Sequence, residues 1–300
     1  MNILKVINVI KIGNVKRTLF MLIFFSSFSF SQDQQEVIIE ISGAELTARL
    51  WQPETAGGET IIALPWGGGS AVGYRYIGPL LAKAGYRLIA LNPRGIDGST
   101  GEYGNLTLHD YAGDVAMVID SLKVNRVHIM GWALGNRVAR TVATDYPSKV
   151  GTVSLLAAGG LVKPATSLEN LGRLMRERDM PLEEQLEIAR SGMFSPKASE
   201  TLIIEFLKNS GNWRAAHAER SAANRATPLA EWWAGGIAPM LIVQGLDDKV
   251  APPENGRRML EEFGDRVTLI NIEESGHVMG LEKPLETVNA IVDFLVQNPL

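Results

Sequence analysis

The chain has 300 residues, of which 46% are hydrophobic and 21% charged, and these values are ordinary for a globular protein. Its formal net charge of -4 gives no basic footprint, so nucleic acid is excluded as an expected partner. Cysteine is absent and only 4 histidines are present, which excludes disulfides and a cysteine nucleophile and argues against a metal or other cofactor.

The first 31 residues are predicted to be a signal peptide rather than part of the fold. An apolar run at 19–25 and a serine-rich stretch ending at Ser31 follow four basic side chains: Lys5, Lys11, Lys16 and Arg17. The run is shorter than the roughly 20 apolar residues of a membrane helix, so no stable membrane insertion of the mature chain is expected. We therefore predict export to the periplasm or beyond, with the net charge changing from -4 to -8 on cleavage. An uncleaved anchor and a start codon chosen too early are the alternatives.

Beyond this segment, short apolar runs alternate with segments of helical spacing. Predicted strands lie at 36–41, 46–51, 60–64, 87–91, 126–130 and 152–157, and predicted helices at 76–84, 108–122 and 136–145. Most of these strands are apolar throughout, which is typical of a parallel sheet covered by helices on both faces. The predicted fold class is a doubly wound, mostly parallel α/β fold.

The alternation stops after Gly160. Residues 167–223 are charged and helical, and three helix breakers divide them into four short predicted helices: Pro181, Pro196 and Gly211. The pattern of strands and helices then returns at 240–244, 254–263, 267–272 and 285–296. We expect a core in two parts, 32–160 and 237–300, with a helical cap at 161–236 over the carboxyl ends of the strands, where ligands of open α/β sheets bind.

Gly131-Trp132-Ala133-Leu134-Gly135 links a predicted strand to a predicted helix. In the nucleophile elbow G-x-S-x-G, the glycines let the chain turn sharply and lift the central residue above the sheet. Both glycines are present here, but Ala133 stands at the centre. Taken alone, the motif also fits a closely packed turn without chemistry.

Two further polar residues follow later strands. Asp248 comes after the strand at 240–244, and His277 after the strand at 267–272. The order of elbow, acid and histidine is that of the α/β hydrolases, in which the acid fixes the tautomer of the imidazole. On these residues the chain resembles α/β hydrolases over nearly its whole mature length. It looks closest to the capped branch that includes epoxide hydrolases, haloperoxidase-like esterases and carbon–carbon bond hydrolases.

Two loops extend the resemblance. Asn92-Pro93-Arg94-Gly95 with Gly98-Ser99 matches the family's loop after the next sheet strand, and Pro65-Trp66-Gly67-Gly68 resembles its His-Gly oxyanion loop. The resemblance implies an oxyanion hole made by the backbone amides of Gly68 and Leu134. It further implies substrate contacts from Trp66 and Trp132, and a site in which Asp248 and His277 accompany Ala133 at the nucleophile position.

Replacements for the missing nucleophile are available near the predicted site. Ser70 lies in the oxyanion loop, and Ser99 and Thr100 lie in the Arg94 loop, although none of them is on an elbow. Asp247 is interpreted as a solvated neighbour of Asp248 rather than a second catalytic acid.

The other histidines receive structural or surface roles. His128 lies within a strand and is expected in the core. His109 is expected to cap a helix or face solvent, and His217 to lie on a solvated helix face rather than in the pocket. Surface or structural roles are also predicted for two arginines after the elbow and two tryptophans that would fasten the cap: Arg137, Arg140, Trp232 and Trp233.

Three functions remain open from the sequence. In the first, His277 oriented by Asp248 acts as a general base on water or on an acidic proton of a small ester-type substrate, without a covalent intermediate. In the second, the chain is an inactive pseudo-hydrolase that binds a small apolar ligand. In the third, Ala133 has been engineered into an ordinary serine esterase. The sequence identifies neither the substrate nor the oligomeric state.

Overall fold

The structure, a computed structural model, describes residues 34–55, 57–177, 179–210 and 212–300. The predicted signal peptide at 1–31 lies outside the described residues, and export therefore stays a prediction. The described residues belong to one compact unit. Within them, no helix has the length and apolar character needed to cross a membrane.

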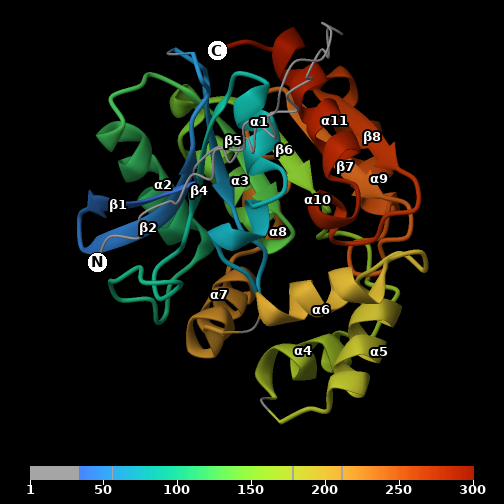
Figure 1. Cartoon of the computed structure of the whole chain (residues 1–300). Helices are drawn as coiled ribbons and strands as arrows, with labels where there is room; N and C mark the ends of the chain where they lie inside the picture. Colours follow the sequence, from blue (N-terminus) through green and yellow to red (C-terminus); the bar gives the residue numbers. More distant parts are fainter. Residues whose placement is uncertain (1–33, 56, 178, 211) are drawn as a thin grey trace, which may run out of the picture. The chain divides into compact units, whose positions relative to one another are not determined.

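The described strands form one eight-stranded sheet in the order β1-β2-β4-β3-β5-β6-β7-β8 (Figure 1). The strands are β1 (Gln35–Ile41), β2 (Ala44–Trp51), β3 (Thr60–Leu64), β4 (Arg87–Leu91), β5 (Val127–Trp132), β6 (Val150–Leu156), β7 (Met240–Gly245) and β8 (Val267–Ile272). The strands from β4 to β8 in this order run parallel, and β2 is antiparallel to both of its neighbours. The mostly parallel sheet predicted from the apolar strands is confirmed.

Two hydrophobic clusters, one on each face of the sheet, explain why the central strands are apolar throughout. In β3, Ile61 and Ala63 belong to one cluster, and Ile62 and Leu64 to the other, because successive side chains of a strand point to opposite faces. The first cluster packs against α1 (Gly78–Lys83) and α11 (Pro284–Gln297), and the second against α2 (Leu108–Ser121), α3 (Leu134–Asp145) and α9 (Glu254–Phe263). The sheet is therefore covered on both faces, as a doubly wound fold requires.

Four short elements that the periodicity did not predict lie between the longer helices and strands of the described residues. They are three 3-10 turns, Ala71–Tyr74, Pro147–Lys149 and Gly264–Arg266, and the helix α10 (Met279–Glu282). The first turn is begun by Ser70, whose side chain accepts from the Val72 amide. Segments of three or four residues are too short to show a hydrophobic period, which is why sequence reasoning missed them.

Five helices lie between β6 and β7, in the part of the chain predicted to be the cap: α4 (Leu168–Arg176), α5 (Leu182–Gly192), α6 (Glu200–Lys208), α7 (Arg214–Ala226) and α8 (Leu229–Trp232). Figure 1 shows α4 to α7 gathered on one side of the molecule, at the bottom of the view. Ser167 and Ser199 cap α4 and α6 by accepting the amide three residues on, a common way to begin a helix. The four helices predicted at 167–223 correspond to α4 to α7, and α8 was not anticipated.

The end of this helical region is fastened to the core around a buried arginine. Arg140 of α3 is fully buried, and its guanidinium lies 4.6 Å from the ring centre of Trp232 and 5.2 Å from that of Trp233. It also donates to the Gly159 carbonyl at 2.7 Å and to Asn136 Oδ1 at 2.8 Å. The structural role predicted for Arg140 and the fastening role predicted for both tryptophans are thereby confirmed.

His128 and His109 are held by polar side chains away from the elbow. His128 is buried in β5 and bonds to Thr152 Oγ1 at 2.8 Å, so its predicted core role is confirmed. Thr107, not His109, caps α2. His109 lies at the surface, where it bridges the carboxylates of Asp145 and Glu231 at 2.7 and 2.8 Å.

Candidate active site

Ala133 occupies a sharp turn between β5 and α3, with φ 51° and ψ -109°. A Cβ at Gly131 would lie 2.4 Å from the Asn136 Cα, and one at Gly135 would lie 2.1 Å from the Leu64 carbonyl oxygen. The two glycines are therefore required by close backbone approach. A positive φ costs a residue with a side chain on the order of 1–3 kcal/mol, and the turn keeps this strain although its central side chain is a methyl group.

Asp248 and His277 meet at the ends of β7 and β8. The Nδ1 atom of His277 lies 2.9 Å from Oδ2 and 3.1 Å from Oδ1 of Asp248, whose side chain is 0% exposed. Oδ1 also accepts from the amides of Val250 and Ala251, at 2.9 and 2.8 Å, and Oδ2 from Gln244 Nε2 at 3.3 Å. These donors hold the carboxylate in one orientation, so that it fixes Nδ1 as the protonated nitrogen of the ring.

The backbone on either side of His277 is held as firmly as its ring. Its amide donates to the Met193 carbonyl at 2.7 Å, and its own carbonyl accepts from Trp132 Nε1 at 2.9 Å. A Cβ at Gly276 would lie 2.4 Å from the Met193 oxygen, so only glycine fits beside this contact. The imidazole is consequently positioned by both the sheet and the segment that follows α5.

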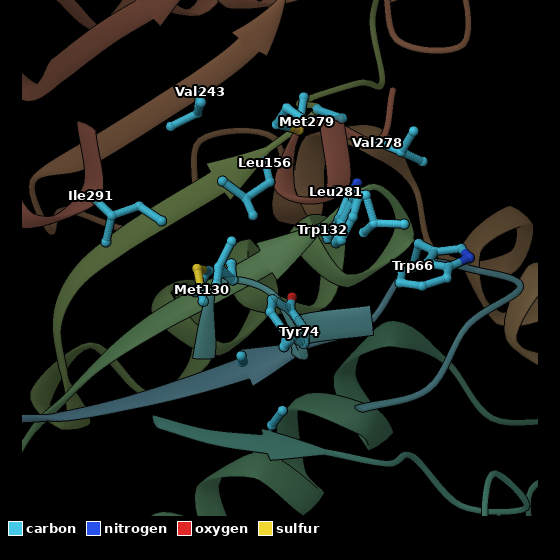
Figure 2. Packing of buried hydrophobic residues seen from close by; sticks show 14 of the residues in the cluster. Trp66, Tyr74, Met130, Trp132, Leu156, Val243, Val278, Met279, Leu281 and Ile291 are labelled. Carbon is cyan, nitrogen blue, oxygen red and sulfur yellow. The ribbon is translucent and has the colours of Figure 1, made fainter. Parts of the chain in front are cut away.

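The prediction that Trp132 contacts substrate is wrong. Trp132 is fully buried and belongs to the cluster shown in Figure 2, where its ring centre lies 4.8 Å from that of Trp66 and 6.1 Å from that of Tyr74. Because side chains alternate along β5, Trp132 points into this cluster and not above the sheet. Its indole supports the loop of His277 instead.

A cavity of about 690 Å³ opens above the elbow. Ala133 and His277 line it together with the three predicted oxyanion and substrate residues Trp66, Gly68 and Leu134. The structure thus brings together every predicted site residue except Trp132, which is covered, and Asp248, which lies behind His277. The volume is in the range of small-molecule sites.

The helical region supplies two unlike walls of this cavity. From α4 come three apolar side chains, Leu168, Leu171 and Met175, with the exposed Arg176 at the end of the helix. From α7 come mainly polar residues at helical spacing, which therefore share one face of the helix: Arg214, His217, Ala218, Ser221, Asn224 and Arg225. We call this face the polar wall.

The prediction for His217 is also wrong. The residue is only 6% exposed and lines the cavity, where neither ring nitrogen makes a well-aligned hydrogen bond to a described residue and the nearest polar contact of the ring is the backbone of Gly68. Burial, together with the smaller effect of the nearby charge of Arg220, lowers the pKa of the imidazole to about 3. His217 is therefore neutral at physiological pH. The spacing of the polar wall was the signal that could have placed it, but the charged composition of α7 suggested a solvated helix.

Two arginines lie beside the polar wall. Arg137, predicted to be a surface or structural residue, lines the cavity one turn into α3 and donates to Asn224 Oδ1. Arg220 of α7 is buried and donates to the carbonyl oxygens of Trp66 and Pro65, at 3.1 and 3.0 Å. Arg220 thereby ties α7 to the loop that carries Gly68.

The alternative nucleophiles are engaged in the fold, and none of them lines the cavity. Ser70 caps its 3-10 turn, Ser99 Oγ donates to the Asn92 carbonyl at 2.9 Å, and Thr100 Oγ1 accepts from the Glu45 amide at 3.0 Å. They do not replace the missing hydroxyl.

Asp247 is half-buried rather than solvated, because its carboxylate accepts from Ser195 Oγ at 2.7 Å. Like Asp248, it does not line the cavity, and the acid that faces His277 is Asp248. Among the described residues, no group of three or more histidine, cysteine, aspartate or glutamate side chains could hold a metal ion.

Comparison with known proteins agrees with this geometry. Residues 59–284 match the family model of the alpha/beta hydrolase fold. A 2-hydroxy-6-oxo-6-phenylhexa-2,4-dienoate hydrolase of Comamonas testosteroni is 30% identical over 86% of this chain and 95% of the relative. A 2-hydroxy-6-oxononadienedioate/2-hydroxy-6-oxononatrienedioate hydrolase of the same species is 27% identical over 69% and 78%.

Solved structures show the same fold at lower identity. An esterase from Exiguobacterium antarcticum superposes with a TM-score of 0.73 at 22% identity, covering 87% of this chain and 100% of the esterase. An enol-lactonase from Burkholderia xenovorans LB400 gives 0.71 at 18%, covering 87% and 100%. With the elbow, the acid and the histidine each at the end of its strand, and with a family model matching most of its length, the chain belongs to the α/β-hydrolase fold family.

Proposed function

We propose that this protein hydrolyses a small ester-type substrate by general-base activation of water, without a covalent intermediate. The observation that carries the proposal is the Asp248–His277 pair, whose carboxylate accepts three further hydrogen bonds, beside a cavity in which a methyl group stands at the elbow. An oriented imidazole can act as a general base on a water molecule as well as on a serine hydroxyl.

In the proposed step, Nε2 of His277 takes a proton from water as the water oxygen attacks the ester carbonyl carbon. The carbonyl electrons move to its oxygen, and the amides of Gly68 and Leu134 bind the resulting oxyanion. The tetrahedral intermediate then expels the alkoxide, which takes the proton back from His277. Ester and water are consumed, an acid and an alcohol are formed, and the enzyme returns to its starting state.

The elbow supports this assignment of the oxyanion donors. Leu134 is the first residue of α3, and the first amides of a helix have no carbonyl partner within the helix. The strained φ of Ala133 turns the chain directly into that helix. Donors of this kind stabilise developing negative charge by roughly 3 kcal/mol each.

The relatives support hydrolysis as the class of reaction. The two curated relatives are named as hydrolases of oxo-dienoates or related dioates, and one structural neighbour is an esterase. Their names leave the alternatives in place. An inactive binder is favoured by the methyl group of Ala133, and an engineered serine esterase by the otherwise complete elbow.

The test is turnover of p-nitrophenyl acetate by four proteins: the natural chain, His277→Ala, Ala133→Ser and the double variant. General-base action predicts that His277→Ala lowers turnover by about 10²–10⁴-fold. His109→Ala is the matched control, because that histidine lies outside the cavity, and its turnover should not change.

Each alternative gives a different pattern. An engineered serine esterase predicts turnover near zero in the unmodified chain, which carries Ala133, and a rise of several orders of magnitude in Ala133→Ser that is lost in the double variant. Absence of turnover in all four proteins would refute the enzymatic proposal and leave the binder.

A further inference from the structure

We propose that the cavity is built for an amphipathic carboxylate, whose anionic group binds Arg137 and Asn224 while its apolar part packs against α4. This inference rests on the proposed function only in using the same cavity as the place of reaction. It names the class of ligand, which neither the reaction nor the fold determines.

The charge of the cavity lining is one-sided. None of the described lining residues is acidic. Five of them are cationic: Arg137, Lys163, Arg176, Arg214 and Arg225. Lys163, Arg176 and Arg225 are exposed, and Arg137 lies half-buried near the elbow. A cleft lined by charges of one sign attracts ligands of the other sign, so the lining favours anions over neutral molecules.

Arg137 is a half-buried member of this set close to the elbow, where it can bind an anion directly. Within the described part of the chain no carboxylate pairs with it, and its one hydrogen bond goes to the neutral oxygen of Asn224. One face of the guanidinium lies 5.3 Å from the ring centre of Trp232, but a guanidinium carries five N–H donors around its edge. Burial lowers the pKa of Arg137 because the charged form lacks a compensating partner. A carboxylate is the planar, bidentate acceptor that fits such an edge.

His217 provides a second, independent sign that the polar wall meets a ligand. It is buried and faces the cavity, and apart from its approach to the backbone of Gly68 its two ring nitrogens make no well-aligned hydrogen bond to a described residue. Seven residues separate it from Asn224, which corresponds to about 10 Å along α7. His217 is near the backbone of Gly68, and Asn224 is near Arg137. A neutral hydrogen-bonding group beside the reacting carbonyl and an anion roughly 10 Å away would occupy both positions.

The opposite wall determines the rest of the ligand. Leu168, Leu171 and Met175 offer no polar side-chain atoms beyond a thioether, and Arg176 lies exposed at the end of α4, so the body of the ligand facing these three side chains is apolar. A ligand with one carboxylate, an apolar body and a hydrolysable carbonyl satisfies both walls. A wholly apolar ligand would leave Arg137 and His217 desolvated and unpaired, which is unfavourable.

The experiment compares 4-phenylbutanoate with 4-phenylbutanamide, which has the same shape but no charge. Affinities are measured by titration calorimetry on the natural chain and on His277→Ala, so that binding is separated from turnover. A charge-assisted contact predicts that the carboxylate binds about 10- to 100-fold more tightly than the amide in both proteins. Arg137→Gln should reduce this preference to less than about threefold, and Arg137→Lys should retain part of it.

The matched control is Arg257→Gln, since Arg257 is exposed on α9 and lies outside the cavity. The preference of this variant for 4-phenylbutanoate over 4-phenylbutanamide should equal that of the natural chain. Equal affinity for the two probes in the natural chain, no binding of either up to about 10 mM, or an unchanged preference in Arg137→Gln would each overturn the inference. The comparison on the natural chain decides the question even if Arg137→Gln fails to fold. A lasting preference for the carboxylate without any ester turnover would refute the proposed function and leave this inference standing.

Discussion

The two sides of the cavity satisfy their polar groups in opposite ways. On the core side, both oxygens of Asp248 and the Nδ1 atom of His277 are engaged within the fold. On the side of the polar wall, the nitrogens of His217 make no well-aligned hydrogen bond in the described part of the chain beyond their approach to the Gly68 backbone, and Arg137 lacks a counter-ion there. Buried polar groups are normally paired, so the contrast has a physical meaning. The core side is completed by folding, and the polar wall is completed by what binds.

This contrast predicts opposite responses to mutation. Removing a group from a satisfied network leaves its partners buried without hydrogen bonds, which destabilises the fold. Removing a group that has no partner leaves nothing unpaired, and it should affect binding more than stability. The following changes test the contrast, beginning with the largest expected effect.

Asp248→Ala should give the largest loss of stability. The amides of Val250 and Ala251 and the Nδ1–H of His277 would lose their acceptor in a buried site, and the combined cost should be about 3–5 kcal/mol. Urea unfolding measures this free energy. Asp265→Ala is the control, because Asp265 is exposed and should change it by less than about 0.5 kcal/mol. A loss below about 1 kcal/mol in Asp248→Ala would mean that the core side is not the satisfied network described.

His217→Phe should alter how stability depends on pH. The pKa of His217 is about 3 in the folded protein and about 6.5 when unfolded, so between these values the unfolded state binds a proton that the folded state does not. The free energy of unfolding of the chain with His217 therefore falls as pH decreases from 6.5 toward 3, by up to about 1.4 kcal/mol per pH unit. The phenylalanine variant lacks this contribution, and the two proteins should diverge as the solution becomes acidic.

His109 should contribute to stability with the opposite dependence on pH, and the variant His109→Gln tests this. Hydrogen bonds to Asp145 and Glu231 raise the pKa of His109, so its contribution to stability is present below its unfolded pKa and is lost as pH rises through the folded one. Thermal unfolding between pH 4 and 8 would distinguish the two histidines, with changes of roughly 1 kcal/mol or less expected for this exposed site. Parallel pH profiles for the natural chain and His217→Phe would show that His217 is not buried as described.

Arg137→Gln should have the smallest effect on stability. The change removes a desolvated charge that has no acidic partner among the described residues, and glutamine can still donate to Asn224. We expect the free energy of unfolding to stay within about 0.5 kcal/mol of that of the natural chain, as measured in urea. A loss above about 2 kcal/mol would identify Arg137 as a structural residue and would remove the contrast between the two sides.

Sequence reasoning was most accurate where the periodic signal was strong. The strands β3, β4 and β8 and the helix α9 have the predicted bounds or lie within one residue of them, because buried parallel strands are continuously apolar and turn residues bound them. The order of elbow, acid and histidine also placed Ala133 and His277 in one cavity. In a parallel sheet the carboxyl ends of the strands share one edge, which makes chain order a guide to proximity.

The same reasoning failed where the direction of a side chain decided the outcome. Trp132 adjoins the elbow in sequence but points into the cluster behind it, and His217 lies on a charged helix but faces inward. Arg137 was predicted to be a surface or structural residue of the helix after the elbow, yet its position one turn into α3 places it in the cavity. Composition reports how polar an element is, but not which face its neighbours cover, and that information comes only from packing.

The two hydrogen bonds from Arg220 to the Trp66 and Pro65 carbonyls bear on the kinetics of ligand exchange. Lifting α7 from the core would break both of these bonds and expose a buried cation, so this movement has a high barrier. The ion pairs of Arg173 in α4, in contrast, reach only Glu177 and Glu184, which belong to the same helical region. We therefore expect ligands to enter and leave on the α4 side while α7 stays in place, so that the oxyanion loop keeps its geometry from one ligand to the next.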